Sequence, residues 1–196
     1  MKHKIVYTAD RKTRGTALLI FLLIAGIAAG SVYAVRGGNA ALPWVNQYFS
    51  PVYSGNTAAA VFCNTLLSSA LFITAAFLFG LWAAAAPIGA AMMLCRGFAV
   101  GASAASMYLS GGLSALPAVL VLLVPKAAAM GVVSLLAVRE LLRSSVMLLG
   151  FFLRGEADRS RDSARLYLIK YGVLLLISIL ISGADAAMNY FFAGLL

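Results

Sequence analysis

Three charged residues, Arg96, Lys126 and Asp185, lie within long apolar runs. A charge at the centre of a lipid bilayer costs at least about 2.5–3.5 kcal/mol on insertion scales, so such residues usually face the interior of a helical bundle and pair. Two cations and one acid leave one positive charge without an acidic partner. Backbone carbonyls freed by a proline, or a partner chain, are the candidates to bind it. The cations either hold broken helix ends together or form a functional cation or partner-docking site, and both alternatives stay open.

Prolines and glycines surround these charges. Pro87 and Pro125 interrupt the apolar runs, and a proline inside a helix removes a hydrogen bond and disrupts it. Gly97 and Gly101 form a GxxxG pattern directly after Arg96, and this pattern lets another helix approach closely. We therefore expect a core of broken, closely packed helices around the charges.

The elements that must position these residues follow from the composition. The 196 residues are 63% hydrophobic and 11% charged, whereas an ordinary soluble domain is about 45–50% apolar and about a quarter charged. A chain of this length has room for several spans of about 20 residues each. The sequence predicts an all-α, polytopic transmembrane helical bundle that forms one integral membrane domain over residues 1–196.

Five spans are predicted. They cover residues 15–35, 57–82, 83–110, 115–138 and 166–190. A cleavable signal peptide competes for the first run, but its 21 apolar residues exceed the usual 7–15, so we interpret it as a retained span. Gly26 and Gly30 give it a small-residue face. The short connection at 83–89 fits a helix hairpin or a partly re-entrant turn.

Residues 139–154 change character, because apolar residues recur at helical spacing while Arg139, Arg143 and Arg154 occupy the other side. This pattern predicts an amphipathic helix that lies in the plane of an anionic inner leaflet. A helical extension of the fourth span is the alternative. Lys170, early in the fifth span, is placed to extend its ammonium group to the cytoplasmic interface.

The cations orient the chain. The net charge is +9, and twelve of the fifteen lysines and arginines lie before the first apolar run or around the start of the last one. Short loops rich in Lys and Arg stay cytoplasmic, so the pattern predicts a multi-pass protein of the cell membrane with a cytoplasmic N-terminus. The cations cluster at the ends of predicted spans and are not spread over a folded surface, so this distribution argues against a nucleic-acid partner.

The segment 36–56 is predicted to face the exterior. Its aromatic residues are Trp44, Tyr48, Phe49 and Tyr53. Such residues form interfacial belts at the membrane surface. The alternative is a docking patch for an extracytoplasmic protein.

Catalytic motifs are missing from the sequence. The only histidine, His3, rules out an HExxH zinc site and a Ser-His-Asp triad, and no GxxxxGK[ST] phosphate loop occurs. Cys63 and Cys95 lie in apolar runs without the spacing of a disulfide framework or a zinc site. We expect no enzyme activity, no metal and no cofactor.

The central stretch resembles the stage II sporulation protein M family of bacterial membrane proteins. The residues that carry the resemblance are Phe79-Gly80, Pro87-Ile88-Gly89, Arg96-Gly97-Phe98-x-x-Gly101, Gly111-Gly112-Leu113 and Leu123-Val124-Pro125. The chain departs from the family at Lys126, where members often have His or Gln. The resemblance implies a non-enzymatic role in spore formation, in which the protein anchors and localises peptidoglycan-degrading partners during engulfment.

Two functions are therefore expected. The first is a membrane scaffold, alone or in a homo- or hetero-oligomer, that holds cell-wall hydrolases through the 36–56 segment. The second is a permease or transporter subunit that uses Arg96, Lys126 and Asp185 around a midplane cavity, where substrate sites of transporters tend to lie. The absence of an obvious internal repeat argues against the second.

Overall fold

The computed structural model describes residues 2–36, 58–82, 85–112, 119–154 and 160–192. Within these ranges the elements are helices, and five of them are long and apolar enough to cross a membrane. The elements are α1 (Lys2–Val35), α3 (Ala58–Gly80), α4 (Ala86–Gly111), the π-helix η3 (Val119–Leu123), α6 (Val124–Arg154) and α7 (Ser160–Phe192). The predicted all-α bundle with five spans is confirmed, and it fits a multi-pass membrane protein.

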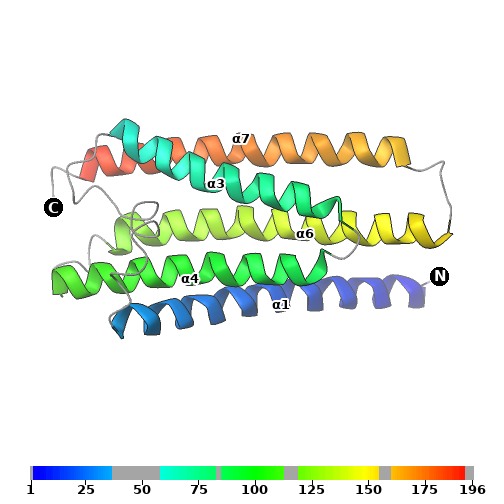
Figure 1. Ribbon diagram of the computed structural model, residues 1–196, viewed down its shortest axis with the longest axis horizontal. Helices are drawn as coiled ribbons and strands as arrows, with labels where there is room; N and C mark the ends of the chain where they lie inside the picture. The colour runs from blue at the N-terminus through cyan, green and yellow to red at the C-terminus, as the bar shows by residue number, and fades with distance from the viewer. Residues whose placement is uncertain (1, 37–57, 83–84, 113–118, 155–159, 193–196) are drawn as a thin grey trace.

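The long helices form two pairs with α6 between them (Figure 1). Helix α1 packs along α4, helix α3 packs along α7, and α6 contacts all four. Successive long helices run in opposite directions, so α1, α4 and α7 begin at the end of the bundle where α3 and α6 finish. We call this the basic end, because the exposed Arg139, Arg143 and Arg165 lie toward it.

The two pairs are joined by apolar packing on α6. Val138 and Leu141 are fully buried there. Val138 packs with Met93 of α4, whereas Leu141 belongs to a second cluster with Ile73 of α3 and Leu174 of α7. Helix α6 is therefore the core element, and the other helices turn large apolar side chains outward, as a lipid-facing surface requires.

Pro87 does not break a helix, contrary to the sequence prediction, whereas Pro125 lies where the type of helix changes. Pro87 stands in the first turn of α4, where its missing N–H has no intrahelical partner to lose and its fixed φ suits the helix. Pro125 stands in the first turn of α6, but the π-helix η3 leads into it without a gap. The interruption predicted at Pro125 is therefore a change from π-helix to α-helix within one span. Pro117, which also lies in the predicted fourth span, is outside the described residues.

Residues 139–154 do not form a separate interfacial helix. They continue α6 without a break, which was the alternative interpretation. The reason is the burial of one side of this segment: Leu141 is fully buried, and Ser145 is 3% exposed and accepts a hydrogen bond from the Ala85 N–H at 3.2 Å. Leu141 and Ser145 therefore face protein, while Arg139 and Arg143 are exposed at the basic end.

The remaining boundaries differ from the predicted spans by a few residues. Helix α1 starts at Lys2, before the apolar span at Gly15, so the basic N-terminal segment is also helical. Helix α3 ends at Gly80 and α4 begins at Ala86, both at the basic end. This geometry fits the hairpin alternative for 83–89, although residues 83–84 lie outside the described part of the chain.

Candidate functional site

Gly97 and Gly101 place α4 against the backbone of α1. A Cβ atom added at Gly97 would overlap the carbonyl oxygen of Leu23, and one added at Gly101 would overlap the carbonyl oxygen of Ile27. Backbone atoms cannot move aside as flexible side chains can. The two helices can therefore keep this separation only while both positions are glycine.

The contact is reciprocal, because α1 supplies its own glycines. A Cβ at Gly26 would overlap the carbonyl oxygen of Leu94, and one at Gly30 would overlap that of Phe98. The hydroxyl of Ser31 donates to the carbonyl oxygen of Gly101 at 3.3 Å across the same contact. The GxxxG patterns of the sequence thus face each other in one glycine-mediated helix contact.

Lys126 and Asp185 form a buried ion pair. Lys126 Nζ lies 2.8 Å from Asp185 Oδ2, and the two side chains are 10% and 3% exposed. Thr65 Oγ1 accepts a hydrogen bond from Lys126 Nζ at 2.9 Å and donates one to the same carboxylate oxygen at 2.8 Å. One residue each from α3, α6 and α7 therefore closes a polar triangle within three apolar spans.

Asn189 completes the surroundings of this carboxylate from the next turn of α7. Its Nδ2 donates to Asp185 Oδ1 at 3.2 Å and to the Asp185 backbone oxygen at 2.9 Å. Lys126 lies seven residues after Val119, the start of its span, which is about 10 Å along the helix. The triangle therefore lies in the half of the bundle opposite the basic end.

The triangle continues as a line of buried polar residues along α7. Ser178, Ser182, Asp185 and Asn189 are each buried and repeat every three or four residues. Ser182 donates to the Ser178 carbonyl oxygen at 2.9 Å. Within the described residues, Ser178 Oγ and Asn189 Oδ1 have no hydrogen-bond partner. Small side chains at this spacing let α3 pack closely on α7.

Arg96 lies apart from the ion pair and connects α4 to α3. It is 8% exposed, and its Nη1 donates to Ser68 Oγ at 3.2 Å. Its guanidinium carbon lies 5.5 Å from the ring centroid of Phe72, within the range of a cation–π interaction. The three intramembrane charges of the sequence are thus divided between two places, and only Lys126 and Asp185 bind each other.

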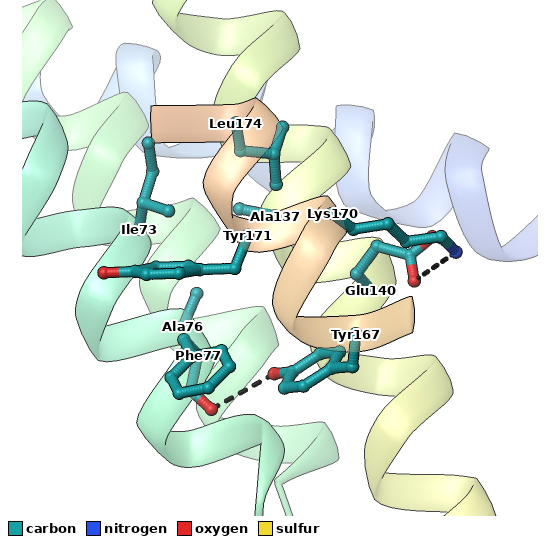
Figure 2. Close-up of a pocket in the computed structure, with 9 residues that line it drawn as sticks. All are labelled: Ile73, Ala76, Phe77, Ala137, Glu140, Tyr167, Lys170, Tyr171 and Leu174. Carbon is teal, nitrogen blue, oxygen red and sulfur yellow. Dashed lines mark hydrogen bonds and ion pairs between the residues drawn. The ribbon is translucent and has the colours of Figure 1, made fainter. Parts of the chain in front are cut away.

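Lys170 forms a second ion pair, with Glu140 of α6. Its Nζ donates to the two carboxylate oxygens at 2.8 and 2.9 Å, and the Lys170 and Glu140 side chains are 31% and 26% exposed. The sequence placed Lys170 at the interface, but it did not single out Glu140 as the partner. This pair borders a pocket among α3, α6 and α7, which Figure 2 shows together with the aromatic residues that line it.

Other predicted site residues lie outside the described ranges. They are Trp44, Tyr48, Phe49 and Tyr53. Within the described ranges, no group of three or more His, Cys, Asp and Glu residues could hold a metal ion. The charged groups that the structure does bring together are bonded to one another across helix contacts, which is an arrangement for holding helices in register.

Sequence reasoning missed Thr65, Asn189 and Glu140. A signal for the first two was present. Thr65 is one of the buried residues of α3 that recur every three or four positions, between Val61 and Ser69. Asn189 continues the same spacing that Ser178 and Ser182 have on α7. Glu140 had a weaker signal as an acidic residue among the arginines after the fourth span.

Comparison with known proteins gives no relative: no family model, no curated protein and no solved structure matches this chain.

Proposed function

We propose that this protein is a non-enzymatic membrane scaffold that anchors peptidoglycan-degrading partners, in the manner of the stage II sporulation protein M family that its central stretch resembles. The observation that carries the proposal is the closed triangle of Lys126, Asp185 and Thr65. Its charges are used up in contacts between three helices of the same chain. A site that binds and releases a charged substrate needs groups that the substrate can reach.

The residues of the resemblance support an architectural role. Gly97 and Gly101 set the contact between α4 and α1, whereas Pro87 and Pro125 stand in the first turns of α4 and α6. A pattern made of helix starts and helix contacts preserves a fold. It requires no reaction centre, and that agrees with a protein that positions other proteins.

The connection 36–56 is the proposed docking segment. Helix α1 ends and α3 begins at the end of the bundle opposite the basic end. If the basic end is cytoplasmic, as the distribution of lysine and arginine predicts, this connection faces the cell wall. Partners that degrade peptidoglycan are captured there, while the five helices hold the segment at the membrane surface.

Affinity purification from sporulating cells in mild detergent tests the proposal. The full chain is expected to co-purify cell-wall hydrolases. A variant in which residues 43–51 are replaced by a Gly/Ser linker is expected to lose them. The matched control replaces the exposed Arg143 by Gln and is expected to retain them. Docking through this segment is refuted if every extracytoplasmic partner stays bound after the linker replacement.

A permease or transporter subunit is the second candidate, favoured by the line of buried polar residues on α7. Ser178 Oγ and Asn189 Oδ1 lack partners within the part of the chain that the structure describes, so they have hydrogen-bonding capacity to spare. Co-purification of an ATPase in place of hydrolases supports this candidate. So does solute flux into liposomes that is lost when Lys126 and Asp185 are replaced together.

A further inference from the structure

The pocket at the basic-end half of α3, α6 and α7 has features that the scaffold role does not use. Its cavity volume is about 20 Å³, and it opens to the surroundings, so it is a shallow depression in the surface. In Figure 2 the rings of Phe77, Tyr167 and Tyr171 lie toward α3, and the Glu140–Lys170 pair lies on the other side of α7. Phe77 stacks on Tyr167 with ring centroids 4.9 Å apart and contacts Tyr171 at 4.6 Å. The pocket thus has one aromatic wall and one charged wall.

The aromatic wall is held in place by its own hydrogen bonds. Tyr167 donates from its hydroxyl to the Phe77 carbonyl oxygen at 3.1 Å, and the Tyr171 hydroxyl shares a hydrogen bond with Thr74 Oγ1 at 2.7 Å. Both tyrosine hydroxyls are therefore hydrogen-bonded to α3. Any ligand of the pocket meets ring surfaces on this side and charges on the other.

The charged wall is open to a ligand, in contrast to the buried triangle. Lys170 and Glu140 are 31% and 26% exposed, whereas Lys126 and Asp185 are 10% and 3% exposed. An ammonium group has three donors, and a carboxylate has about four acceptor positions. The two bonds between Lys170 and Glu140 leave both groups with capacity for an added partner.

The depth of the pocket matches the boundary between headgroups and acyl chains. The span Val119–Leu148 has 30 residues and is about 45 Å long, which equals a bilayer with its headgroup regions. Lys170 lies five residues from Arg165, where the last span begins, so it is about 8 Å inside the end of that span. At this depth the polar groups of a phospholipid come within reach of the pocket.

We propose that this pocket binds the headgroup of a phospholipid that carries a phosphate and a primary ammonium, as phosphatidylethanolamine does. The phosphate accepts a hydrogen bond from Lys170, and the ammonium donates one to Glu140. An anionic headgroup without an amine leaves Glu140 facing a second negative charge. A trimethylammonium headgroup has no N–H to donate, so it forms only the phosphate contact. The nearby aromatic faces attract either cation, so the preference between these two headgroups depends on the hydrogen bond to Glu140.

Native mass spectrometry of the full chain in mild detergent tests the proposal. It is titrated with phosphatidylethanolamine, phosphatidylcholine and phosphatidylglycerol that have identical acyl chains. Phosphatidylethanolamine is expected to bind about tenfold more tightly than phosphatidylcholine, because it adds one charge-assisted hydrogen bond. The double substitution Glu140→Gln/Lys170→Met is expected to abolish the preference. The control Arg143→Gln removes an exposed cation of the same helix and is expected to keep it.

Three results would overturn the proposal. They are equal affinity for phosphatidylethanolamine and phosphatidylcholine, a preference that survives the double substitution, and tighter binding of phosphatidylglycerol that is lost in Arg143→Gln. The last result assigns lipid binding to general attraction by the arginines of the basic end. The ranking of the three lipids on the unsubstituted chain needs no variant, so the proposal stays testable if the double variant does not fold.

Discussion

Separating the Lys126–Asp185 pair is expected to destabilise the bundle more than removing both charges together. The substitution Asp185→Leu leaves the Lys126 ammonium buried with a hydrogen bond to Thr65. The substitution Lys126→Met leaves the Asp185 carboxylate with hydrogen bonds from Thr65 and Asn189. Asp185→Leu is therefore the more damaging of the two single changes.

The magnitudes follow from burial and from the number of bonds lost. Breaking a buried ion pair by removing one partner costs about 3–5 kcal/mol, and replacing both partners by apolar residues of similar volume is often neutral. The double variant still loses the bonds to Thr65 and Asn189, and hydrogen bonds between membrane helices average about 0.6 kcal/mol. We expect the double variant to lose about 1 kcal/mol. Because each single substitution costs about 3–5 kcal/mol, the coupling free energy between Lys126 and Asp185 is then at least about 5 kcal/mol.

Unfolding in mixed micelles with increasing SDS measures these free energies, with helicity followed by circular dichroism. The four chains of the cycle are the unsubstituted protein, Asp185→Leu, Lys126→Met and the double variant. Independent sites add to within about 0.3–0.5 kcal/mol. Additive effects of the two single substitutions would refute the ion pair as the connection between α6 and α7.

Two further outcomes are expected in the same assay. Gly101→Val places side-chain atoms against the Ile27 carbonyl and is expected to lower the free energy of unfolding by about 1–3 kcal/mol. The control Gly183→Ala, at a position with nothing within 4 Å, is expected to be neutral or stabilising. Equal losses of stability in the two variants would contradict the close contact. Arg96→Lys keeps the charge but loses the planar group over Phe72, so a loss of about 0.5–2 kcal/mol is expected, and no loss would contradict the cation–π contact.

The helices and their glycine contacts were accessible from the sequence, because they depend on local patterns. Apolar runs gave the five spans, and the spacing of Gly97 and Gly101 predicted a close approach that the structure places against α1. Pro87 was misjudged, since a proline disrupts a helix only when it is preceded by a full turn. Pro87 is in the first turn of α4, and hydropathy alone does not locate a helix start to within a turn.

The pairing of charges could not be predicted, for a geometric reason. Periodicity shows which residues share one face of a helix, but it does not show which neighbour that face meets. Lys126 and Asp185 are 59 positions apart, and their contact depends on the rotation of α6 and α7 about their own axes. The same uncertainty hid Thr65, which is one of several polar residues on α3 and takes its role only from the two helices it faces.

The two ion pairs show how one kind of interaction serves two purposes in this bundle. Around Asp185, a threonine and an asparagine add hydrogen bonds, and Lys126 and Asp185 are 10% and 3% exposed, so the pair holds helices together. Around Glu140, the surroundings are ring faces and an open pocket, so the pair keeps capacity for another molecule. Among the residues that carry the resemblance, Gly97 and Gly101 set a helix contact and Pro87 stands in a first turn, so they also serve the fold. Substituting them therefore tests the fold, and function is better sought at the Glu140–Lys170 pocket and in the 36–56 segment.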